Sequence, residues 1–165
     1  MRVANVFDPA FDHEEDRPGF TYRRARVGWQ AGSERLGASL YELPPGQASF
    51  PYHRHAANEE LLIVLSGRPS LRSPSGWREL AEGEVVAFRA GEDGAHQIVN
   101  RGQDRATFFV LSTMIAPEIT EYLDTGKVGA LERAPGARGS GGQRFFKPGD
   151  AVDYWEGEEP PGEAR

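Results

Sequence analysis

Residues 46–67 read GQASFPYHRHAANEELLIVLSG, and this stretch decides the fold. Three of its side chains can bind a metal ion: His53, His55 and Glu60. The two histidines are one residue apart, so on a strand they share a face, with Cβ atoms about 6–7 Å apart. Glu60 lies five residues beyond His55, which is the wrong parity for one continuous strand. The chain must therefore turn at residues 56–58, so that Glu60 returns opposite the histidines on the next strand.

A fourth candidate ligand, His96, lies in a second glycine-bounded stretch, GEVVAFRAGEDGAHQIVN, residues 83–100. A lone histidine is more often a core or surface group, but three of the four histidines of this chain stand at these positions. Three imidazole nitrogens and one carboxylate suit one divalent transition metal ion: Fe, Mn, Ni, Zn or Cu. Four such ligands leave one or two positions of an octahedral ion open to water or substrate, as catalysis requires.

The spacing of these residues resembles the two motifs of the cupin superfamily. The first motif, in which glycines flank a His-x-His pair and a glutamate, matches Gly46, His53, His55, Glu60 and Gly67. The second matches Gly83, Gly91, His96 and Asn100, with Arg89 in place of a proline. The resemblance covers about residues 37–113. It implies a small single-barrel cupin of the conserved-barrel type 2 kind, an all-β jelly roll or double-stranded β-helix, which binds metal through His53, His55, Glu60 and His96.

The strand pattern agrees with a barrel. Eight short segments read as strands, separated by glycine- and proline-rich turns: 38–43, 48–55, 60–66, 68–73, 77–80, 84–88, 96–100 and 106–112. Short strands at regular spacing, with no long amphipathic helix between them, indicate an antiparallel sandwich or barrel. A jelly roll fits best.

The strand at 60–66 is apolar on both faces. If Glu60 points inward, so do Leu62 and Val64, because alternate residues share a face. Leu61, Ile63 and Leu65 then point outward and need cover. A second sheet, the N-terminal arm or a dimer partner would supply it. We therefore expect a homodimer or arms draped over the barrel.

Three segments are expected along the chain: an N-terminal arm at 1–35, the cupin barrel at 36–115, and a C-terminal extension at 116–165 that docks on the barrel. The arm reads as irregular, apart from a strand near 22–28. In the extension, 117–123 reads as a short helix, 136–142 as a flexible loop, and the chain from about 157 as a disordered acidic tail. Four aromatic residues are expected to anchor the extension: Phe145, Phe146, Tyr154 and Trp155.

Composition narrows the partners. The chain has 165 residues, which fits one domain, and a net charge of −6, which argues against a nucleic-acid or anionic-membrane surface. The basic run at 23–26, RRAR, reads as a solvated face or as an anion-binding or partner-binding patch. No cysteine is present, which excludes disulfides and thiolate ligands. With no apolar N-terminal segment and no apolar run longer than 61–65, a cytoplasmic protein is expected.

Four residues are candidate substrate contacts. Tyr41, Gln47 and Phe50 are expected near the barrel interior, although each can equally be plain core. Arg89 is expected at the barrel mouth, where it would bind a substrate carboxylate or phosphate bidentately, or pair with Glu92 or Asp93 on the surface.

The resemblance implies a metal-dependent enzyme acting on a small organic molecule by dioxygenase, decarboxylase or isomerase chemistry, with Glu60 as a catalytic base. A thiol dioxygenase with a Cys–Tyr crosslink is excluded because the chain lacks cysteine. The alternative is a non-enzymatic module that binds or senses a sugar or an organic acid through the metal.

Overall fold

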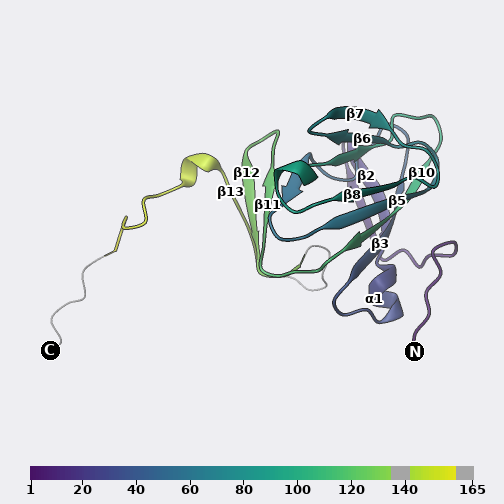
Figure 1. The fold of residues 1–165 in the computed structure, drawn as a ribbon, viewed down its shortest axis with the longest axis horizontal. Helices are drawn as coiled ribbons and strands as arrows, with labels where there is room; N and C mark the ends of the chain where they lie inside the picture. Colours follow the sequence, from purple (N-terminus) through teal and green to yellow (C-terminus); the bar gives the residue numbers. More distant parts are fainter. Residues whose placement is uncertain (135–141, 159–165) are drawn as a thin grey trace.

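The computed structural model describes residues 1–134 and 142–158, and it folds into two layers of antiparallel strands that face each other (Figure 1). The first layer is a six-stranded sheet in the order β1-β2-β3-β10-β5-β8. Its strands are β1 (His13–Arg17), β2 (Phe20–Ala25), β3 (Gly37–Leu43), β10 (Ala106–Ser112), β5 (Glu60–Ser66) and β8 (Val85–Phe88). Helix α1 (Val27–Ala31) connects β2 to β3.

The second layer consists of two smaller sheets. One has the order β13-β12-β11-β4, from β4 (His53–His55), β11 (Glu118–Tyr122), β12 (Lys127–Leu131) and β13 (Gln143–Phe146). The other has the order β7-β6-β9, from β6 (Ser70–Ser73), β7 (Gly76–Glu79) and β9 (Gln97–Val99). Two 3-10 helices complete the described chain: η1 (Glu92–Gly94) and η2 (Pro148–Asp150). The jelly-roll architecture expected from the sequence is thereby confirmed.

The core lies between the two layers. Leu62 and Val64 of β5 are almost fully buried, as the parity argument predicted. They join a cluster of ten buried side chains from both layers: Tyr22, Tyr41, Leu43, Leu62, Val64, Leu71, Leu80, Phe88, Ile98 and Phe108. Because strand side chains alternate, the odd-numbered residues of β5 face outward.

The N-terminal arm covers part of that outer face. Ala4, Val6 and Phe11 pack in a second apolar cluster, which includes Leu65 of β5 and Phe109 of β10. The N-terminal arm is therefore one source of cover for the outward apolar residues, as considered from the sequence. The outer face of β8 is open, and Val85 there is 56% exposed.

The N-terminal arm is also more regular than the sequence indicated. Residues 13–25 form a hairpin of β1 and β2, which pair from His13 with Arg24 to Arg17 with Phe20. Pro18 and Gly19 make the hairpin turn, with Gly19 at φ +82°. Glycine readily adopts a positive φ, so this dipeptide lets the chain reverse between the two strands.

Two further expectations are corrected. Residues 117–123 do not form a helix: they contain β11, which pairs with β4 on one side and β12 on the other. The strand expected over 48–55 is shortened to β4, because Pro51 has no N–H to donate to a ladder.

The aromatic residues of the C-terminal extension do not all act as anchors. Phe145 and Phe146 lie in β13, paired to β12. Tyr154 and Trp155 are 82% and 71% exposed and pack on each other, ring edge to ring face. Figure 1 shows this last part of the chain extending away from the two layers. The loop expected at 136–142 lies outside the described residues except for Gly142, and so does most of the acidic tail.

No helix among the described residues is long and apolar enough to cross a membrane.

Candidate metal centre

The two halves of the second layer meet at a pair of histidines. His53 at the start of β4 and His96 beside β9 form an isolated antiparallel bridge. The backbone N–H of His96 donates to the carbonyl of His53 at 2.8 Å, and the N–H of His53 donates to the carbonyl of His96 at 3.1 Å. Because directly opposite residues point to the same face, both imidazoles enter the interior. Their ring centroids are 4.6 Å apart.

Glu60 approaches these histidines from the other layer. It is the first residue of β5, beyond the turn at residues 56–58 that its parity required. Its Oε2 lies 3.3 Å from Nε2 of His96. One ligand atom each from His53, Glu60 and His96 all lie within 4.8 Å of one another. Two buried imidazoles and one carboxylate therefore converge on a common point.

Backbone carbonyls fix the orientation of both rings. Nδ1 of His53 donates to the carbonyl of Pro51 at 2.8 Å, and Nδ1 of His96 donates to that of Gly94 at 2.9 Å. A carbonyl only accepts, so each Nδ1 carries the hydrogen and each neutral ring has its lone pair on Nε2. Such carbonyl contacts are the usual outer partners of metal-binding histidines. The donor set thus fits a divalent transition metal ion.

The sequence around His96 is adapted to this geometry. A Cβ at Gly94 would lie 1.7 Å from the carbonyl oxygen of Arg89. A larger residue at this position could not present its carbonyl to Nδ1 of His96 without moving the backbone. Phe88 stacks on a face of that ring, with the ring centroids 3.9 Å apart and an angle of 9° between the ring planes. The His96 ring is held by both contacts.

His55 stands slightly apart from the other three. Its Nε2 lies 3.6 Å from Oε2 of Glu60, but it is not part of the group whose atoms lie within 4.8 Å. Its Nδ1 is buried and has no hydrogen-bond partner, with Oε2 of Glu118 at 3.9 Å. Unlike those of His53 and His96, its Nδ1 is therefore not committed to a backbone carbonyl.

Burial sets the protonation of these groups. It lowers the pKa of His53 to about 3, with help from the nearby His96 and His55. Burial also lowers the pKa of His55. For Glu60 burial acts to raise the pKa, but the contact with His96 and the other surrounding imidazoles outweigh it, so the pKa is lowered overall. Neutral imidazoles beside an ionised carboxylate are the forms that bind a cation.

A buried glutamate from the C-terminal extension holds the turn between His55 and Glu60. Glu118 of β11 is 1% exposed, and its carboxylate accepts the backbone N–H groups of Ala56, Ala57 and Asn58 at 2.9, 3.2 and 3.0 Å. The side-chain amide of Asn58 donates to the same carboxylate. Sequence reasoning missed Glu118, because its segment reads as a helix and nothing local marks its partner 60 residues earlier.

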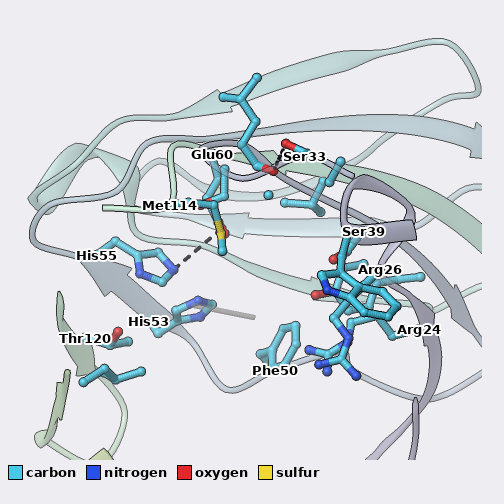
Figure 2. Close-up of a pocket in the computed structure, with 18 of the residues that line it drawn as sticks. Arg24, Arg26, Ser33, Ser39, Phe50, His53, His55, Glu60, Met114 and Thr120 are labelled. Atoms are coloured by element: carbon cyan, nitrogen blue, oxygen red, sulfur yellow. Dashed lines mark hydrogen bonds and ion pairs between the residues drawn. The ribbon is translucent and has the colours of Figure 1, made fainter. Parts of the chain in front are cut away.

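His53 and Glu60, with His55, border a cavity of about 420 Å³, within the range of small-molecule sites. Its walls come from the inner face of the six-stranded sheet and from both terminal segments. The N-terminal part contributes Arg24, Arg26 and Trp29, and the C-terminal part contributes Met114, Thr120, Tyr122 and Phe145. Figure 2 shows His53, His55 and Glu60 on one side of this cavity, with Arg24 and Arg26 on the other. A smaller cavity of about 30 Å³, large enough for water, lies on the His96 side.

Of the four residues expected to contact a substrate, two line the large cavity and two do not. Tyr41 and Phe50 line the large cavity. Gln47 and Arg89 line neither of these two cavities, and Arg89 is exposed. The arginines that do line it, Arg24 and Arg26, belong to the basic run at 23–26, which the sequence left open between a solvated face and an anion patch.

Comparison with known proteins agrees with this architecture. The family model of the cupin domain matches residues 39–112. The chain contains a cupin barrel. The matched segment includes β3, β10 and all strands between them, with His53, Glu60 and His96. No curated protein is significantly similar to the chain.

Several solved structures resemble more of the chain than the barrel alone. A sugar phosphate isomerase of the cupin superfamily from Silicibacter pomeroyi is 25% identical with a TM-score of 0.75, over 90% of this chain and 94% of its own. A protein of Acidithiobacillus ferrooxidans, provisionally assigned as a sugar phosphate isomerase, is 25% identical with a TM-score of 0.71, over 82% of each chain. The polyketide cyclase RemF from Streptomyces resistomycificus is 23% identical with a TM-score of 0.54, over 68% of this chain and 78% of its own, and shares the fold.

Proposed function

We propose that this cupin is a metal-dependent enzyme that isomerises a small carbonyl compound, such as a sugar derivative. The observation that carries the proposal is the convergence of His53, Glu60 and His96, of which His53 and Glu60 line a 420 Å³ cavity. A metal held there would polarise a carbonyl oxygen as a Lewis acid. Cavity residues would then position the rest of the molecule and move its proton.

The protein groups have distinct roles in such a reaction. His53 and His96 hold the ion through Nε2, because their Nδ1 atoms are committed to backbone carbonyls. Glu60 would take a proton from the hydroxyl-bearing carbon next to the carbonyl and return a proton to the former carbonyl carbon, while the proton of that hydroxyl passes to the former carbonyl oxygen. The pKa of the Tyr41 phenol is raised by burial, so the hydroxyl stays protonated and can donate a hydrogen bond to a substrate oxygen.

The comparisons support isomerisation over the other chemistries considered. Two solved structures that cover 82% and 90% of this chain, each at 25% identity, are named as a provisionally assigned sugar phosphate isomerase and a sugar phosphate isomerase. Their likeness extends over at least 82% of this chain, and so beyond the residues of the cupin domain. The additional segments supply walls of the cavity here, including Arg24 and Tyr122.

We also propose that the chain acts as a cytoplasmic homodimer. The outer face of β5 and β8 is apolar, and the N-terminal arm covers only its Leu65 end. Leu61 and Ile63 remain partly exposed beside Val85. Light scattering coupled to size exclusion tests this, with twice the chain mass expected and the single chain mass contradicting it.

The test of the enzyme proposal is deuterium incorporation. Metal-loaded protein is incubated in D₂O with aldoses, ketoses and their phosphate esters, and the α-proton signal is followed by NMR. We expect loss of that signal with at least one compound. In Glu60→Gln the rate of this loss should be at least about 100-fold lower than in wild type. Tight binding of a compound without exchange or turnover would instead identify the non-enzymatic binding module.

A further inference from the structure

The end of the cavity away from the histidines contains an arginine that no carboxylate neutralises. Arg24 lies on β2, directly opposite Tyr41 of β3 and His13 of β1. Its side chain lines the cavity. Its Nε is buried and has no hydrogen-bond partner. A buried guanidinium N–H without an acceptor is costly, so its persistence calls for a partner that the protein alone does not supply.

The other partly buried arginines of the described chain are all paired. Their partners are Glu42 for Arg23, Asp12 for Arg26, Glu92 and Glu121 for Arg54, and Asp124 for Arg72. The absence of a carboxylate beside Arg24 is therefore specific to the cavity face of β2. Arg23, the next residue, points to the opposite face and is fully matched by Glu42.

Nearby charges leave this end of the cavity positive. Arg26 lines it too, and its Nε donates to Asp12. Glu34 lines the same cavity but is exposed to solvent, where its charge is screened. The Tyr41 phenol interacts with Arg24 and also with the carboxylate of Glu60. A metal ion would neutralise that carboxylate.

We propose that Arg24, assisted by Arg26, is an oxyanion subsite, and that the ligand carries a carboxylate or phosphate at the end remote from the metal. The planar guanidinium suits bidentate binding of either group. Tyr41 lies between the two ends and contacts the middle of the ligand. The assignment of the metal-facing end rests on the proposed function, whereas anion binding by Arg24 does not.

The experiment compares three probes of matched size by isothermal titration: glycerol 3-phosphate, glycerate and neutral glycerol. Each is titrated into metal-loaded and EDTA-treated wild-type protein, and into Arg24→Gln. Arg23→Gln is the matched control, because it removes the same group from the opposite face of the same strand. Arg89→Gln tests the arginine favoured by the sequence. Metal content is measured separately for every sample.

We expect one or both anionic probes to bind wild-type protein more tightly than glycerol, and Arg24→Gln to weaken that binding about tenfold or more. Arg23→Gln and Arg89→Gln should bind as wild type does. Tighter binding of the phosphate or of the carboxylate identifies the source of the anion. Retention of Arg24-dependent binding after EDTA treatment supports the subsite even if no metal chemistry exists.

Three results would overturn the subsite: equal affinity in Arg24→Gln and wild type, an equal loss in Arg23→Gln, or no preference of wild type for anionic over neutral probes. None of them depends on turnover or on metal content. The failure of the subsite and the failure of the proposed enzyme are therefore separable.

Discussion

Glu118 accepts the backbone N–H of Asn58 at 3.0 Å, and this bond joins the C-terminal extension to the turn between His55 and Glu60. The turn is where the chain passes from one layer to the other. Its N–H groups point inward at a carboxylate that is itself 1% exposed. The extension is thus part of the support of the candidate metal centre.

We predict that Glu118→Ala lowers the free energy of unfolding by at least about 3 kcal/mol, because it leaves several buried donors without an acceptor. Metal affinity should fall as well, since the turn positions Glu60. Urea denaturation and metal titration measure the two effects. The control is Glu121→Ala, on the same strand but paired with Arg54 at the surface, which should cost less than about 1 kcal/mol.

The histidines should differ in their effect on metal affinity. His53 and His96 each offer a ligand atom to the group formed with Glu60, in which all three atoms lie within 4.8 Å of one another. His55 lies outside this group. We expect His53→Ala and His96→Ala to raise the metal dissociation constant at least about tenfold more than His55→Ala does. Competition titration with a chelating dye measures the constants. Equal losses in all three variants would make His55 a full ligand.

The metal-free protein should lose stability in acid. The pKa of His53 is about 3 in the folded state, against 6.5 for an unperturbed histidine. The unfolded chain therefore binds the proton first as pH falls below 6.5. Its unfolding free energy should fall by about 2 kcal/mol between pH 7 and pH 5 from His53 alone. Urea melts at both pH values test this, and His53→Gln should abolish that part of the change.

Tyr154 and Trp155 should contribute little to the stability of a single chain. Both are largely exposed and contact each other. We expect Trp155→Ser to change the free energy of unfolding by less than about 0.5 kcal/mol. By comparison, Phe108→Ala, at a residue 1% exposed, should cost about 3–5 kcal/mol. A loss of more than about 1 kcal/mol in Trp155→Ser at low protein concentration would restore the role of anchor.

The barrel and its turn were predictable because they depend on local signals. Glycines that bound short strands mark turns, and the parity of Glu60 relative to His55 required a change of layer, as found. Glu118 was not predictable as a site residue, since it acts through a turn 60 residues earlier in the sequence. For Arg24 the sequence left a solvated face and an anion-binding patch open, because only the fold shows that this residue lines the cavity. The helix expected at 117–123 failed for the same reason: pairing with β4 and β12 overrides weak local preference.

The most direct test of the metal centre is the metal-to-protein ratio of the purified chain, measured by elemental analysis after growth without metal supplementation. The account predicts about one transition-metal ion per folded wild-type chain and less than about a tenth of that in the His53→Ala, His96→Ala double variant. Circular dichroism confirms that the variant is folded. An unchanged ratio in the folded double variant would contradict the central claim.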